Sequence, residues 1–74
     1  MLTVTLQIAN QKMDIMVRQD QRIADVLRVL KENQKIFFQI ERIVIYSVRK
    51  KMYVNQLLTF KQAHIYSGDI LILK

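Results

Sequence analysis

The sequence has no cysteine, no proline and no tryptophan, and only one glycine and one histidine in 74 residues. Without cysteine it can form neither disulfides nor a thiolate metal site, so packed aliphatic side chains must supply its stability. No apolar run approaches the roughly 20 residues that cross a bilayer, and the amino-terminal residues lack the pattern of a secretory signal. These absences favour a soluble, cytoplasmic protein without direct membrane insertion.

Groups that could carry out catalysis are equally scarce. Nucleophilic catalysis needs an activated nucleophile beside an oriented base, and metal hydrolysis needs clustered ligands. The carboxylates are scattered along the chain, and the lone Gly68 cannot form a phosphate-binding loop. We interpret His64 as a loop histidine and Asp69 as a turn former. The sequence therefore predicts no enzyme, no catalytic residue, no metal site, no cofactor and no small-molecule substrate.

The length and the charge set the remaining bounds. A chain of 74 residues supports one core, so we expect residues 1–74 to form a single domain, and the start at Met1 favours a stand-alone protein. Twelve Lys and Arg against six Asp and Glu give a net charge of +6. This charge would attract acidic partners, whether nucleic acid, an anionic membrane surface or an acidic protein face.

The first half of the sequence predicts a hairpin and a helix. Apolar and polar residues alternate over residues 2–8 and again over residues 13–17, which is the period of a half-buried strand. Asp20 is a plausible N-cap for the helix that follows. Its apolar residues have the i, i+3, i+4, i+7 spacing of one helical face: Ile23, Val26, Leu27 and Leu30.

The second half predicts shorter elements. We expect residues 36–40 to form a packed connecting segment and residues 42–48 to form a third strand. Phe37, Phe38 and Phe60 are expected to lie in the core. The charged residues 49–51 make a solvated turn into a short strand at residues 52–54. A loop with one helical turn leads to Gly68, which can adopt the positive φ of a tight turn, and residues 70–73 form the last strand.

This order of elements predicts an α+β fold. One mixed sheet of four or five strands, packed on one helix in the order ββαββ with a helical turn before the last strand, buries every apolar face. The first and last strands would pair in parallel at the centre. This is the β-grasp arrangement.

Several segments resemble ubiquitin in outline: the hairpin, the helix "DQRIADVLRVL", the strand "ERIVI" and the final "TFKQAHIYSGDILIL". The chain is similar, more specifically, to the small bacterial ubiquitin-like proteins of the YukD/EsaB family. The resemblance implies an accessory or regulatory component of the type VII (Ess/Yuk) secretion system of Gram-positive bacteria. It differs from that family in its strongly basic charge and in a turn, "SVRKKMYV", without glycine or asparagine.

Conjugated relatives of this fold are activated through a flexible tail that ends in Gly-Gly. Here the sequence ends on Leu73 and Lys74, directly after the last strand. We therefore expect neither conjugation nor a terminal thiocarboxylate.

Strand alternation assigns residues to the two faces of the sheet. Leu71 and Leu73 should face the helix, together with Val4, Leu6, Ile15, Val17, Ile43 and Ile45. The outer face should then carry an apolar patch of about 300 Å², a size at which patches are often functional, rimmed by basic residues and by Thr3 and Thr5. The candidate protein-binding residues are Val44, Tyr46, Ile70, Ile72, Arg42 and Lys74. In this interpretation Arg42, Lys74 and residues 49–51 steer an acidic protein partner, such as a secretion-system component.

Three alternatives stay open. The patch could be a homodimer contact, and a register shifted by one residue would invert the face assignment. The positive charge also suits a small RNA-binding β-grasp protein. Such proteins pair a basic groove with stacking aromatics, and Tyr46 is the one aromatic residue that alternation places well for this.

Overall fold

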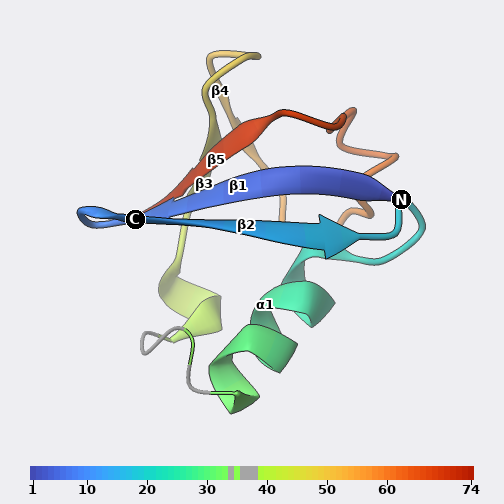
Figure 1. Cartoon of the computed structure of the whole chain (residues 1–74). Helices are drawn as coiled ribbons and strands as arrows, with labels where there is room; N and C mark the ends of the chain where they lie inside the picture. Colours follow the sequence, from blue (N-terminus) through green and yellow to red (C-terminus); the bar gives the residue numbers. More distant parts are fainter. Residues whose placement is uncertain (34, 36–38) are drawn as a thin grey trace.

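The computed structural model describes residues 1–33, 35 and 39–74. Within these residues five strands form one sheet, and a single α-helix lies against one of its faces (Figure 1). In chain order the elements are β1 (Leu2–Ile8), β2 (Gln11–Val17), α1 (Ile23–Glu32), the 3-10 helix η1 (Ile40–Arg42), β3 (Ile45–Ser47), β4 (Met52–Val54) and β5 (Ile70–Leu73). This order confirms the predicted β-grasp arrangement.

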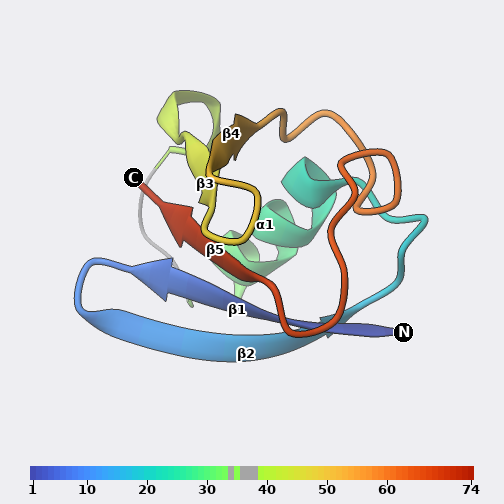
Figure 2. The same ribbon diagram turned by 90° about the horizontal axis from the view of Figure 1, so that it is seen from above.

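The strands lie in the order β2-β1-β5-β3-β4, which Figure 2 shows from above. β1 and β5 pair in parallel at the centre, with Leu6 beside Leu71, while all other neighbours are antiparallel. The predicted parallel pairing and the predicted position of the last strand are both confirmed. The arrangement leaves β2 and β4 as the two edges of the sheet.

The core lies between the sheet and α1, as strand alternation predicts. Leu71 and Leu73 of β5 are buried toward the helix, where they meet Ile23 and Leu27 of α1. Burying a side chain of this size contributes about 1.5–3 kcal/mol, so this layer is the main source of stability. The buried apolar residues are Val4, Leu6, Val17, Ile23, Ala24, Leu27, Ile40, Ile43, Ile45, Phe60, Ala63, Ile65, Leu71 and Leu73.

The prediction that Asp20 caps the helix is wrong. The N-cap residue is Arg22, which makes no side-chain capping bond, and the carboxylate of Asp20 pairs with Arg18 instead. The first N–H groups of the helix, on Ile23 and Ala24, donate to main-chain carbonyls of the loop at residues 56–58. Main-chain carbonyls of a distant loop therefore satisfy the N–H groups that a capping side chain would otherwise bind.

The third strand is shorter than the predicted span of residues 42–48. Arg42 lies in η1, because the chain makes a 3-10 turn at Ile40, whose side chain is buried in the core. Hydrogen bonds to the last strand nevertheless extend past both ends of β3, from Val44 and from Val48. The predicted positions of Phe37 and Phe38 lie outside the described residues, whereas Phe60 is buried as predicted.

Candidate functional site

The face of the sheet opposite α1 carries the residues that alternation selects. On the core side Ile45 and Leu73 are buried, so the residues before and after them point outward. Hydrogen bonds and register set these residues opposite one another in three cross-strand pairs: Val44–Lys74, Tyr46–Ile72 and Val48–Ile70. We call the six residues of these pairs, together with Tyr53, the outer patch.

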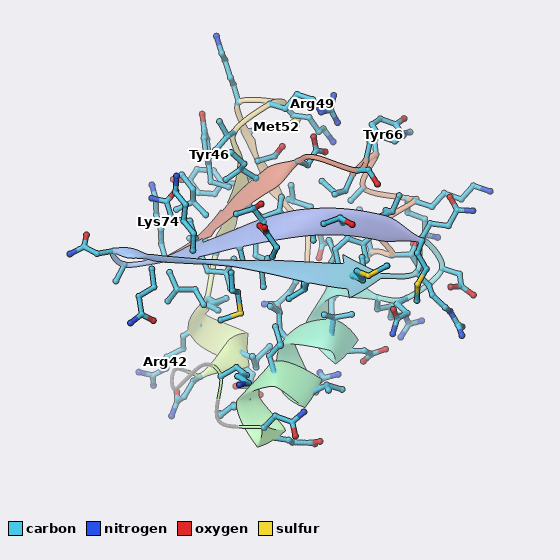
Figure 3. The ribbon with its side chains drawn as sticks, viewed as in Figure 1. Arg42, Tyr46, Arg49, Met52, Tyr66 and Lys74 are labelled. Carbon is cyan, nitrogen blue, oxygen red and sulfur yellow. The ribbon has the colours of Figure 1, made fainter. Side chains whose placement is uncertain are left out.

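An aromatic pair and a lysine form one end of the outer patch. Tyr46 stands opposite Tyr53 of β4, with ring centroids 5.2 Å apart in an edge-to-face arrangement. The ammonium of Lys74 lies 5.5 Å from the Tyr46 ring centre and 5.8 Å from that of Tyr53. Figure 3 shows Tyr46 and Lys74 on the side of the sheet away from the helix. The geometry is that of a cation–π contact, so this charge sits directly on apolar surface.

The remainder of the outer patch is aliphatic and open to solvent. Val44 is 49% exposed and Val48 40%, beside Tyr53 of the aromatic pair at 57%. Ile70 and Ile72 of β5 are partly buried. Their neighbours in β1 are Thr5 and Gln7. Sequence reasoning missed Val48 and Tyr53. The alternation would have included Val48, whereas the position of Tyr53 depends on the register of the β3–β4 hairpin.

Arg42 does not join the outer patch. It lies in η1, on the helix side of the sheet (Figure 3), where it lines a shallow hollow of about 320 Å³ with Gln39, Ile43 and Lys74. Arg42 is therefore not part of the third strand, as the predicted span of residues 42–48 assumed, but it shares this hollow with Lys74 of the outer patch. Its proposed role in binding stays a prediction.

Arg49 and Lys51 are exposed in the turn at residues 49–51, as the sequence predicts, whereas Lys50 is half-buried. The guanidinium of Arg49 makes two hydrogen bonds to the Asp69 carboxylate, at 2.6 and 3.1 Å, and donates to the carbonyl of His64 at 2.7 Å. The ammonium of Lys50 donates to the carbonyl of Ala63 at 2.6 Å. Both cations thus bind the loop before β5, although Arg49 is itself exposed, as Lys51 is.

Asp69 organises the turn that starts the last strand, as the sequence predicted. Its side chain is 4% exposed and accepts a hydrogen bond from the N–H of Tyr66, while Gly68 has a φ of +91°. Burial acts to raise the pKa of Asp69, but the bonds from Arg49 and from Tyr66 outweigh it and leave the pKa below its ordinary value. The carboxylate therefore has a structural role in the described structure.

His64 is an exposed loop residue with a φ of +56°. It borders a broad hollow that also includes Asp20 and Tyr66. In residues 1–33, 35 and 39–74 no group of three or more His, Asp or Glu side chains lies close enough to hold a metal ion. None of the helices in this part of the chain is long and apolar enough to cross a membrane.

No family of known proteins matches this sequence, and neither does any curated protein. Solved structures match over nearly the whole chain. The ubiquitin-like domain of the Arabidopsis thaliana protein At2g32350 has a TM-score of 0.78 at 11% identity, covering 99% of this chain and 74% of that one. The UBL domain of Plasmodium falciparum Dsk2 has a TM-score of 0.72 at 12% identity, covering 99% and 97%.

A bacterial domain belongs to the same group of structures. The EccD5 ubiquitin-like domain from Mycobacterium xenopi has a TM-score of 0.67 at 19% identity, covering 99% of this chain and 91% of that one. The chain therefore has a ubiquitin-like β-grasp fold.

Proposed function

We propose that this chain is a non-conjugating ubiquitin-like module that binds another protein through the outer patch. The observation that carries the proposal is the outer patch itself. Half-buried and exposed aliphatic residues, two tyrosines and a lysine gather on the face of the sheet that no other described element covers. Aromatic anchors beside aliphatic residues are typical of the centre of a protein interface, with the charged group at its rim.

An acidic partner fits the outer patch better than a second copy of this chain. A twofold contact of the patch with itself would bring together two molecules that each carry a charge of +6, with Lys74 inside the contact. An acidic side chain of a partner could instead pair with Lys74 while its apolar neighbours cover Ile70 and Ile72. Such complementarity contributes mainly to the rate and specificity of association.

Non-covalent binding is also consistent with the carboxyl-terminal strand. The single glycine of the sequence is Gly68, so the chain contains no Gly-Gly pair. The N–H of Lys74 donates to the carbonyl of Val44 at 3.0 Å, and the N–H of Val44 donates to the carbonyl of Lys74 at 3.1 Å. These two residues are thus bound to each other in the sheet.

We also propose that this module is a cytoplasmic accessory or regulatory component of a bacterial type VII secretion system. This placement rests on the resemblance of the sequence to the YukD/EsaB family, and the fold shared with the EccD5 domain is consistent with it. Its partners would then be proteins of the secretion apparatus.

RNA binding is a second candidate, and one observation favours it. Tyr53 joins Tyr46 on the open sheet, and the ammonium of Lys74 lies 5.5 and 5.8 Å from the centres of the two rings. Aromatic side chains on a sheet with a nearby cation can stack on bases and contact phosphate. Against it, the two rings stand at 71° to each other, so they do not present parallel stacking faces.

Affinity purification distinguishes these candidates. The tagged protein is recovered from its own cells at moderate salt, with and without nuclease, beside Ile72→Glu, which places a charge at the centre of the outer patch. Leu57→Glu is the matched control, because Leu57 is 65% exposed in a loop outside the patch. We expect secretion-system proteins with the wild type and the control, and their loss with Ile72→Glu.

The opposite pattern would contradict the proposal. If all three forms recover the same nuclease-sensitive material, and this recovery falls steeply with added salt, the basic surface is the functional one. Circular dichroism of each variant establishes that its fold is intact.

A further inference from the structure

A second surface, independent of the outer patch, lies along the other edge of the sheet. An apolar groove of about 350 Å³ runs between β2 and α1. We call it the β2–α1 groove. Met16 and Val29 on its borders are 67% and 53% exposed, so they add apolar surface next to the groove. The residues that line it include Ile15, Met16, Val17, Val26, Val29 and Leu30.

The hydrogen-bond pattern shows which main-chain groups of β1 face its neighbours. The N–H of Thr5 donates to Asp69, and the carbonyl of Thr3 accepts from Gly68. Odd-numbered residues of β1 therefore direct their main-chain groups toward β5, and even-numbered ones toward β2. The register pairs Val4 with Ile15 and Leu6 with Met13, so odd-numbered residues of β2 face β1.

It follows that Lys12, Asp14 and Met16 direct their main-chain N–H and C=O groups away from the sheet. Within the described part of the chain β2 pairs with β1 alone, and it is the outermost strand in Figure 2. Three outward residues at alternate positions span about 14 Å, which matches about five residues of an added strand. Unpaired edges of this kind are templates for strand addition.

We propose that the β2 edge and the β2–α1 groove together bind an extended segment of a partner protein, which adds to the sheet as a strand next to β2. Its main chain pairs with Lys12, Asp14 and Met16. Because side chains alternate along a strand, every second residue of the segment enters the groove and packs against Val26, Val29 and Leu30 of α1. These positions take β-branched or other aliphatic side chains.

Charge indicates the residues at the ends of that segment. Lys12 is exposed near the start of β2, and Arg22 is exposed at the start of α1 next to Gln21, which lines the groove, so each of the two elements that form the groove carries an exposed cation near its start. Arg18 is paired with Asp20, and Asp14 accepts a hydrogen bond from Thr5. With a net charge of +6 on the whole chain, acidic residues should flank the apolar positions of the partner.

A second copy of this chain fits the edge poorly. An antiparallel β2–β2 contact that used all three outward residues would set Asp14 directly opposite Asp14 of the other copy. Like charges in that position are destabilising, and both molecules carry the same positive net charge. The occupant that we infer is therefore an acidic, extended peptide segment.

The test uses the capped peptide DEVTVTVDE, in which valines alternate, and its charge-reversed counterpart KKVTVTVKK. Binding to the full chain is followed by amide chemical shifts and by hydrogen exchange. We expect the acidic peptide to bind with a Kd of about 10⁻⁴ M and the basic one at least about tenfold more weakly. The amides of Lys12, Asp14 and Met16 should exchange about tenfold more slowly in the complex.

Two substitutions separate the parts of the site. Met16→Pro removes an outward N–H that bonds to no other strand, which edge strands tolerate, and Val29→Glu places a like charge beside the acidic peptide. Both should weaken binding at least about tenfold, while Leu57→Glu and the outer-patch variant Ile72→Glu should leave it unchanged. Failure of the outer patch and failure of the groove are thus measured separately.

Three results would overturn the proposal. One is the absence of saturable binding at about 1 mM peptide. Another is binding that Ile72→Glu abolishes and Val29→Glu preserves. The third is protection of the same three amides in the free protein at concentrations where it dimerises, because a second copy would then occupy the edge.

Discussion

The β1–β2 hairpin pairs seven residues of one strand with seven of the other, whereas the β3–β4 hairpin pairs three with three. The short hairpin has other support. From its turn, Arg49 and Lys50 reach residues 20 and 13 positions further along the chain, at Asp69 and Ala63. The first hairpin thus depends on local strand pairing, and the second on side chains that bind the loop before β5.

This difference matters for both proposed surfaces. The β2 edge belongs to the self-sufficient hairpin, while the outer patch is built largely on β3, β4 and β5. A change that loosens the loop at residues 61–69 should therefore disturb the outer patch and spare the β2–α1 groove.

Truncating a core side chain of β5, the strand that joins the two hairpins, should have the largest effect on stability. Leu71 is fully buried in the central strand β5, so Leu71→Ala should lower the free energy of unfolding by about 2–5 kcal/mol. Denaturant unfolding measures this, and protection from hydrogen exchange should fall in both hairpins together. If β1–β2 kept its protection, the two hairpins would not share one cooperative unit.

Asp69→Asn should destabilise the β3–β4 hairpin more than the β1–β2 hairpin. It removes the charge that Arg49 binds at a nearly buried site, which should cost about 1–3 kcal/mol. We expect faster hydrogen exchange in β3 and β4 and little change in β1 and β2. Equal losses in both hairpins would contradict the comparison.

The same carboxylate predicts a dependence on pH. The pKa of Asp69 is lowered in the folded protein, since its hydrogen bonds outweigh the effect of burial. Its stabilising contribution is therefore complete above the unfolded pKa of about 3.9 and is lost as the pH falls through the lower folded value. Asp69→Asn should show a flatter loss of stability than the wild type in this acidic range.

The smallest effect concerns the turn of the short hairpin. Lys51 has a φ of +56°, a conformation that glycine adopts without strain. Lys51→Gly should therefore raise the free energy of unfolding by up to about 1 kcal/mol, which thermal unfolding would show as a higher Tm. A lower Tm would mean that the Lys51 side chain contributes more than the strain of the turn costs.

The parts of the fold that follow from local patterns were predictable. Alternation gave β1, β5 and the outward direction of Ile70 and Ile72, and the Gly-Asp pair gave the turn at Gly68. The predictions that were wrong concerned features that depend on tertiary contacts. The helix start is capped by distant carbonyls rather than by Asp20, and no periodicity reveals such a partner.

The site shows the same division. Tyr46 was assigned to the outer face by alternation, but its contact with Tyr53 depends on hairpin register. Arg42 was assigned to the third strand because the 3-10 turn at Ile40–Arg42 leaves no signal in the alternation. The engaged state of Arg49 could not be predicted, since its partner Asp69 is far away in sequence and looks like an ordinary turn residue.

The parallel pairing of β1 with β5 has a kinetic consequence. Thr5 and Ile70 are neighbours in the sheet although they lie near opposite ends of the sequence. Closing so long a loop costs chain entropy before the contacts between β1 and β5 can stabilise the structure. Folding therefore slows as the mean sequence separation of contacting residues increases. Each hairpin can form locally within microseconds, but the joining of the two hairpins through β5 should limit the overall folding rate.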